Sequence, residues 1–121
     1  MATGTISVND ANVYEYFMTA ATALASRITV QNGGYRKIGS TVIINYKIKA
    51  VATAANSPQV LSDFPAPRID SALSCIDITN GIGNAIESSI PCGIADNGKL
   101  YMKSITTDHI YVITGCYVTA S

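Results

Sequence analysis

The sequence contains no tryptophan and only one histidine, and charged residues make up just 13% of its 121 residues. Ordinary soluble domains carry about 25% charged residues. Because the formal net charge is zero, there is no excess of basic side chains to neutralise phosphates, and nucleic-acid binding is not expected. The apolar runs are shorter than the roughly 20 residues that cross a bilayer, and residues 1–4 lack the basic and apolar regions of a signal peptide. We therefore expect no membrane insertion, and synthesis and folding in a cytosol.

Motifs for catalysis and metal binding are also missing. The single histidine, His109, follows Asp108 in what reads as a turn before a strand, and no nucleophile-elbow motif accompanies it. Gly81-Ile82-Gly83 is not followed by the third glycine and the helix of a phosphate-binding loop. The acidic residues are scattered, and spacing alone does not tell whether two of them face each other across a cleft. The sequence predicts a protein that is not an enzyme, with no catalytic residue, metal or cofactor.

The cysteines are few and far apart. Cys75, Cys92 and Cys116 form no Cys-x-x-Cys pair, and each falls in a predicted strand. Nothing basic or imidazole-bearing lies close in sequence to activate a thiol. We predict buried free thiols that behave as small hydrophobes, and a reactive or metal-bound cysteine is the alternative.

The residues that are abundant favour strands. The chain has 16 isoleucines, 8 valines and 12 threonines but only 4 leucines, and β-branched side chains suit a pleated, half-buried surface. From Val42 to Ala50 the residues alternate: one face is apolar, and the other carries Asn45, Lys47 and Lys49. This period of two predicts a half-buried antiparallel strand from residue 41 to 51.

Turn signals recur about every ten residues along the rest of the chain. Asn32-Gly33-Gly34 predicts a hairpin between strands 28–31 and 35–38, and Asp96-Asn97-Gly98-Lys99 predicts another after a strand from 85 to 95. Three prolines make residues 53–70 a loop, before a strand over 72–79. The segment 109–119 is apolar on both sides, so it is a central strand or its outer face meets another subunit. Six to eight short strands predict an all-β antiparallel β-sandwich or jelly-roll-like domain over residues 28–121.

Residues 1–27 are predicted to be a separate N-terminal extension, acting as an anchor or an oligomerisation segment. Within it, Asp10 is a possible helix cap, and apolar residues such as Val13, Phe17 and Leu24 recur at helical spacing. The same region also reads as a strand through Tyr14 and Tyr16. We favour a short helix over residues 10–26.

The low charge also bears on partners. With hydrophobic residues at 48%, there is little charge to cover a monomer, and we expect part of the surface to be buried in an oligomer. Saccharide sites combine the face of an aromatic ring with polar groups that hold hydroxyls. The residues that combine these features in or near loops are candidate contacts for such a ligand: Asp63, Phe64, Arg68, Asp70, Tyr101 and Tyr111.

Three segments together resemble the small β-sandwich heads of bacteriophage tail and baseplate receptor-binding proteins. They are Tyr35-Arg36-Lys37-Ile38-Gly39-Ser40-Thr41-Val42, then Leu61-Ser62-Asp63-Phe64-Pro65-Ala66-Pro67, then Asp96-Asn97-Gly98-Lys99-Leu100-Tyr101. The order and spacing of these segments carry the resemblance, which covers residues 28–121. It implies a homotrimeric virion protein, made in the host cytoplasm, that contacts other virion proteins and binds host surface carbohydrate without catalysis.

Two other functions stay open at this point. Family heads usually follow a long shaft, whereas only about 27 residues precede the resemblance here. A capsid decoration or head-fibre protein anchored to the capsid through its N-terminal segment fits this arrangement as well. A lectin-like or hydrolytic β-sandwich outside any virion is the second alternative.

Overall fold

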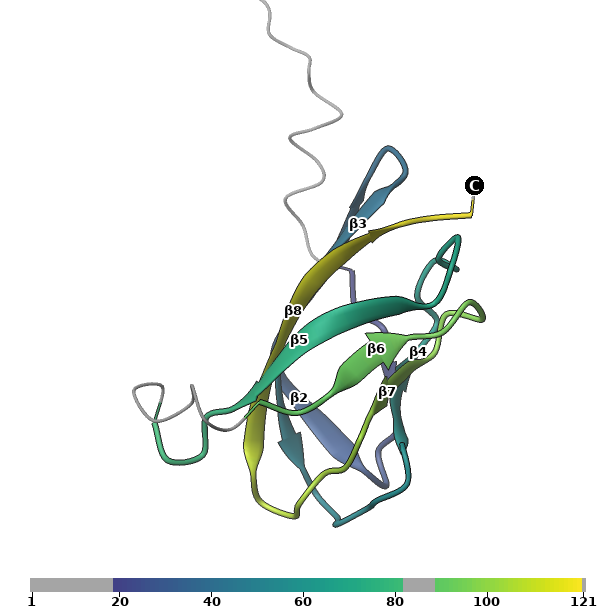
Figure 1. Cartoon of the computed structure of the whole chain (residues 1–121). Coiled ribbons are helices and arrows are strands. Elements are labelled where there is room, and N and C mark those ends of the chain that lie inside the picture. Colours follow the sequence, from purple (N-terminus) through teal and green to yellow (C-terminus); the bar gives the residue numbers. More distant parts are fainter. Residues whose placement is uncertain (1–18, 82–88, 121) are drawn as a thin grey trace, which may run out of the picture.

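The computed structural model describes residues 19–81 and 89–120, and these residues form eight strands and no helix. All strand pairs are antiparallel, in the order β1-β4-β7-β6-β5-β8-β3-β2 (Figure 1). The predicted antiparallel all-β class is therefore confirmed. The strands are β1 (Thr22–Ala23), β2 (Ile28–Ile38), β3 (Thr41–Ala50), β4 (Gln59–Ser62), β5 (Ser71–Asp77), β6 (Cys92–Ile94), β7 (Leu100–Met102) and β8 (Ile110–Val118).

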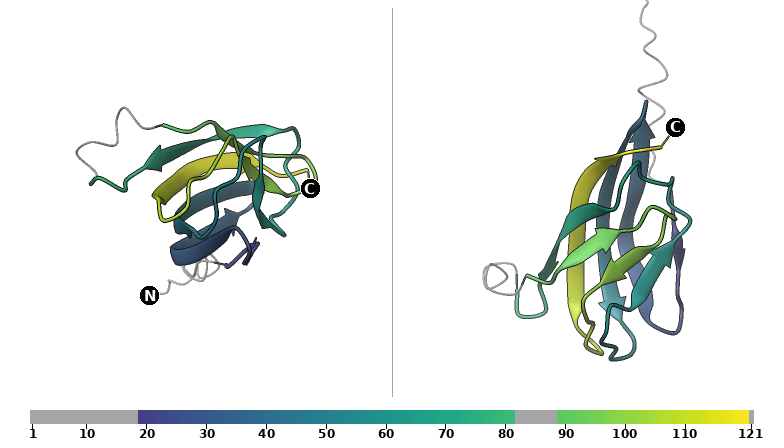
Figure 2. Two further views of the ribbon diagram at one scale, coloured as in Figure 1. Left: turned by 90° about the horizontal axis from the view of Figure 1, so that it is seen from below. Right: turned by 45° about the vertical axis from the view of Figure 1, so that its right-hand side comes forward.

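The single sheet curls until its two ends approach each other, which gives a nearly closed barrel (Figure 2). The seam between the ends runs along β2. Just before β1, the Thr19 N–H donates to the Tyr35 carbonyl at 2.7 Å, and the Tyr35 N–H donates back to the Thr19 carbonyl at 2.9 Å. Among the described residues, this bridge pairs the β2 edge at Tyr35, which satisfies part of the backbone that an open edge would present.

The barrel interior holds the hydrophobic core. Along β3 the predicted alternation holds: Val42, Ile44, Tyr46, Ile48 and Ala50 are all buried. Strand β8 lies between β3 and β5. The sequence left open whether this two-sided apolar strand is central, and the structure places it there.

The predicted hairpin at Asn32-Gly33-Gly34 is wrong. Strand β2 runs through these residues, and every residue of it except Gln31 pairs with β3. A register shift between Val30 and Asn32 marks a β-bulge at Gln31. Gly33 follows it within the strand, where it pairs with Tyr46 at a φ of 92°. The chain instead reverses at Gly39 and Ser40, between the paired residues Ile38 and Thr41. Gly39, at a φ of 61°, occupies the first turn position, where a two-residue hairpin favours glycine.

The predicted helix over residues 10–26 is wrong for the part that the structure describes. Residues 10–18 lie outside the described residues, but Thr22 and Ala23 form β1, which pairs with β4. The Ala21 N–H donates to the hydroxyl of Tyr46 at 2.9 Å. Tertiary pairing therefore outweighs the helix propensity of this alanine-rich stretch.

The proline-bearing segment 53–70 was predicted to be loop throughout, yet it contains β4. Strand β4 lies between Pro58 and Pro65, so neither proline interrupts its ladder. Its residues Val60 and Leu61 are fully buried. In contrast, the hairpin predicted at residues 96–99 is confirmed, because it joins β6 to β7. Only Cys92–Ile94 of the strand predicted over 85–95 belong to β6, and residues 85–88 lie outside the described part.

Candidate functional site

Two of the six predicted ligand contacts lie in the core. The ring of Phe64 packs against Tyr35 and Tyr46, with ring centroids 5.2 Å and 6.0 Å apart, and only 5% of Phe64 is exposed. Tyr111 is 2% exposed, and its hydroxyl accepts a hydrogen bond from the Thr106 N–H at 2.9 Å. Neither side chain reaches the surface of this chain, so the structure does not support surface contacts by these two residues.

Two further candidates are exposed but do not line the groove that is described next. Asp63 has a φ of 68°, and its carboxylate accepts a hydrogen bond from the Thr22 hydroxyl, which ties the loop after β4 to β1. Arg68 is exposed, and its backbone N–H donates to the carbonyl of Val118 at 2.9 Å. The observed contacts of Asp63 and Arg68 hold loops to strands.

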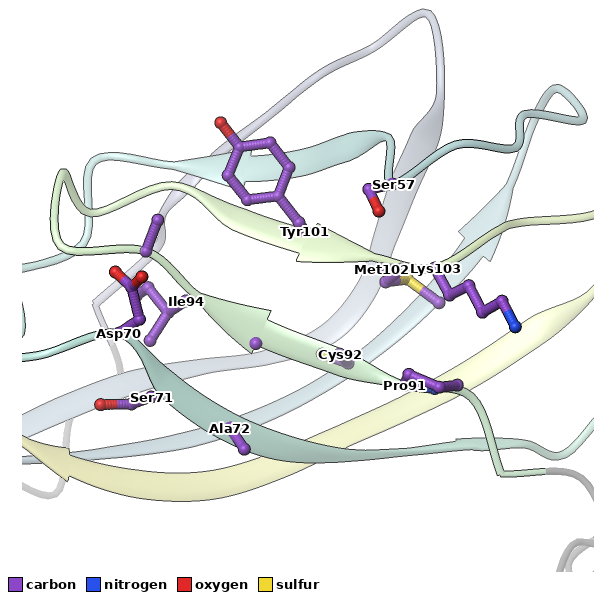
Figure 3. Close-up of a pocket in the computed structure, with 12 residues that line it drawn as sticks. Ser57, Asp70, Ser71, Ala72, Pro91, Cys92, Ile94, Tyr101, Met102 and Lys103 are labelled. Atoms are coloured by element: carbon purple, nitrogen blue, oxygen red, sulfur yellow. The ribbon is translucent and has the colours of Figure 1, made fainter.

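The structure does bring Asp70 and Tyr101 together, because both line one open groove of about 630 Å³ over β5, β6 and β7 (Figure 3). Leu100 and Met102 of β7 point into the core, so Tyr101 between them points outward. A volume of this size is typical of small-ligand sites. The full lining is Ser57, Asp70, Ser71, Ala72, Pro91, Cys92, Gly93, Ile94, Ala95, Tyr101, Met102 and Lys103.

Strand register explains why the groove lies beside Tyr101. Tyr101 pairs with Gly93 of β6, and Gly93 pairs with Ala72 of β5. The row of outward positions next to the tyrosine therefore carries only a hydrogen atom and a methyl group. A large ring beside small neighbours leaves one side of the ring open to a ligand.

Asp70 is fixed at the start of β5 by the neighbouring hairpin. The N–H of Asp96 donates to Oδ1 of Asp70 at 2.8 Å, which holds the carboxylate at the end of the groove (Figure 3). Sequence reasoning missed Ser57, Gly93 and Lys103. Gly93, inside a predicted strand, was the available signal, because a glycine in a strand often marks a close approach of backbone or ligand.

A second polar cluster lies at the opposite end of β5. Oδ2 of Asp77 is 2.6 Å from Nδ1 of His109, and the hydroxyl and N–H of Thr79 both donate to Oδ1 of Asp77. Burial raises the pKa of the Asp77 carboxyl, but the hydrogen bonds from Thr79 and His109 outweigh it and hold that pKa below its usual value. Asp108, which precedes His109 in the sequence, has its Oδ1 atom 3.9 Å from Nζ of Lys49 instead.

Among the described residues, this cluster supplies a carboxylate and an imidazole, and no hydroxyl or thiol is hydrogen-bonded to the imidazole. The hydroxyl of Thr79 donates to Asp77 and accepts from the N–H of Ile110, so it contacts the carboxylate and not the imidazole. A catalytic triad needs a hydroxyl or thiol bonded to the imidazole. In residues 19–81 and 89–120, no group of three or more His, Cys, Asp or Glu side chains gathers that could hold a metal ion.

The three cysteines are free thiols on strands β5, β6 and β8. Cys75 is buried, and the neighbouring Cys92 thiol and desolvation raise the pKa of its thiol. Cys92 is half-buried, and Cys116 is exposed on the outer face of β8. The prediction of buried thiols is therefore correct for Cys75 and wrong for Cys116. The side chains that share the outer face with Cys116, Thr114 and Val118, are exposed as well.

Comparisons with protein-family models, with curated proteins and with solved structures find no match to this chain. Within the described part of the chain, no helix is long and apolar enough to cross a membrane.

Proposed function

We propose that this chain is a non-catalytic saccharide-binding protein of a bacteriophage virion, of the receptor-binding head type, and that the groove over β5, β6 and β7 is its binding site. The observation that carries the proposal is the pairing of an outward aromatic ring, Tyr101, with an oriented carboxylate, Asp70, in one groove. Aromatic faces pack on the C–H surfaces of sugars, and carboxylates accept hydrogen bonds from their hydroxyls.

The fold and the composition support this proposal. An antiparallel all-β barrel positions the groove on paired strands. Three sequence segments within residues 28–121, in their order and spacing, resemble phage receptor-binding heads. The serines Ser57 and Ser71 add hydroxyl groups to the groove wall. Hydroxyl and carboxylate groups beside a ring suit a neutral, hydroxyl-rich ligand surface.

We also propose that the chain acts as a homotrimer that contacts other virion proteins. Support comes from the low content of charged residues, 13% of the chain, and from apolar side chains that remain exposed on the surface. Ile69 is 72% exposed and Val118 is 45% exposed, and the N–H of Arg68 binds the carbonyl of Val118. Exposed apolar side chains near one another are a common mark of contact surfaces.

The binding site is tested by calorimetric titration of a panel of host-type oligosaccharides against the wild type and Tyr101→Ala. Truncating a ring that packs on a ligand costs about 1–2 kcal/mol, so we expect affinity to fall roughly five- to thirtyfold. Tyr101→Phe keeps the ring and is expected to bind within about threefold of the wild type. Asp63→Asn is the control, because Asp63 is exposed but lies outside the groove, and we expect its saccharide affinity to equal that of the wild type.

Binding that survives unchanged in Tyr101→Ala would contradict the assignment of the groove, and absence of binding to every saccharide would contradict the proposed function. Light scattering at several concentrations tests the assembly. A stable mass of three times 12.7 kDa is expected for the head. A monomer that binds empty capsids and no saccharide would favour the capsid decoration protein instead.

A further inference from the structure

The groove has opposite charges at its two ends. Asp70 lies at one end, where β5 begins, and Lys103 lies at the other, just after β7 (Figure 3). In this view Tyr101 projects from β7 and lies nearer to Asp70 than to Lys103. A ligand that fills the groove therefore meets a hydrogen-bond acceptor at one end and a cationic donor at the other.

Lys103 is held at the groove by its backbone, whereas Asp70 is held through its carboxylate. The Lys103 N–H donates to the Pro91 carbonyl at 2.8 Å, and its own carbonyl accepts from the Ser57 N–H at 3.1 Å. Lys103 thus joins two other lining residues of the groove. Its ammonium group is on a flexible stem that can follow a ligand.

Among the described residues, Asp70 and Lys103 form no ion pair with each other or with another side chain. The ion pairs within residues 19–81 and 89–120 join Lys49 to Asp108 and His109 to Asp77. Oδ1 of Asp70 accepts a hydrogen bond from the Asp96 N–H. Within the described residues, Oδ2 of Asp70 accepts no hydrogen bond. An ionised carboxylate has about four lone-pair sites, so Asp70 keeps acceptor capacity for a ligand.

We infer that the ligand is an acidic saccharide, bound with its carboxylate at Lys103 and its hydroxyl groups at Asp70. This inference rests on the proposed function and adds the ligand's charge and its direction in the groove. The reverse orientation would place two carboxylates together at Asp70, and like charges repel. A neutral saccharide would gain no charge attraction from the exposed ammonium group of Lys103.

The test compares matched acidic and neutral ligands by calorimetric titration. The pairs are sialyllactose and trigalacturonate, each compared with its own methyl ester. We expect the acidic member to bind about two- to fivefold more tightly at low salt, the range for an exposed ion pair. Lys103→Gln should remove this preference and leave the affinity for the neutral member unchanged. Lys47→Gln is the matched control, because Lys47 is exposed on β3, outside the groove.

Salt provides a second readout that a general loss of structure would not produce. The preference for the acidic member should shrink as ionic strength rises in the wild type and stay flat in Lys103→Gln. Equal binding of acidic and neutral members would overturn this inference while leaving the proposed function intact. A preference that persists in Lys103→Gln would also overturn it. Failure of every saccharide to bind would overturn both.

Discussion

Replacing Gly33 by alanine tests the bulged strand β2 directly. Gly33 has a φ of 92°, where an L side chain costs about 1–2 kcal/mol. A Cβ atom at this position would also lie 1.9 Å from the carbonyl oxygen of Asn45, so the backbones of β2 and β3 must separate. Forcing extra atoms into a packed contact costs about a further 1–3 kcal/mol. We expect a total loss of roughly 2–5 kcal/mol, out of the 5–15 kcal/mol that is typical of a domain.

Thermal unfolding followed by circular dichroism measures this loss. For a domain of this size 1 kcal/mol lowers the Tm by roughly 3–5 °C, so Gly33→Ala should lose on the order of 10 °C or more. Gly39→Ala is the matched control, since Gly39 also has a positive φ but a Cβ atom there would meet nothing within 4 Å. It should lose only about 1 kcal/mol. If the two variants lose the same stability, Gly33 lies in an exposed turn, and the continuous pairing of β2 is refuted.

Two further predictions concern side chains at the ends of β5 and on β8. Because hydrogen bonds hold the pKa of Asp77 below its usual 3.8, its contribution to stability is fully present above about pH 5 and is lost as pH falls through the lowered pKa. Denaturant unfolding of the wild type and Asp77→Asn should therefore show a gap near neutral pH that narrows towards pH 2, and a gap that is constant with pH would refute this account. Native protein treated with a thiol reagent should be labelled at Cys116 within minutes and at Cys75 only after unfolding, because Cys116 is exposed and Cys75 is buried. Peptide mapping by mass spectrometry measures this order, and early labelling of Cys75 would contradict the buried placement.

Strands with strong local patterns could be predicted from the sequence. The alternation from Val42 to Ala50 fixes both the presence of β3 and the face that it buries. The Asp96-Asn97-Gly98-Lys99 signal correctly located a hairpin. In both segments the local preference and the tertiary pairing agree, which makes local reasoning sufficient.

Prediction failed where one local signal serves two structures. Asn32-Gly33 suits a hairpin turn because glycine accepts a positive φ, but here Gly33 takes its positive φ inside a paired strand. The choice depends on Asn45 and Tyr46 of the facing strand, which pair with Gly34 and Gly33. Such partners are distant in sequence and carry no local mark.

The candidate site was only partly predictable for a related reason. Asp70 and Tyr101 have suitable chemistry, and the pairing of β5, β6 and β7 brings them to one groove. Phe64 and Tyr111 have similar chemistry and polar neighbours, yet their rings are in the core. The polarity of the neighbouring residues does not tell which way an aromatic side chain points. Lys103 was missed because only the register of β6 and β7 reveals that it borders the groove.

The position of β8 bears on when this protein can fold. In the described residues, β8 alone pairs with both β3 and β5, so it joins the β2–β3 hairpin to the sheet of β5, β6, β7 and β4. A two-stranded hairpin is marginally stable by itself. Strand β8 also follows every other strand in the chain, so it leaves the ribosome after them. Until β8 has formed, the β2–β3 hairpin lacks the strand that pairs it with the rest of the sheet. We therefore expect this domain to fold in one cooperative step once β8 has been made, and not strand by strand as it emerges.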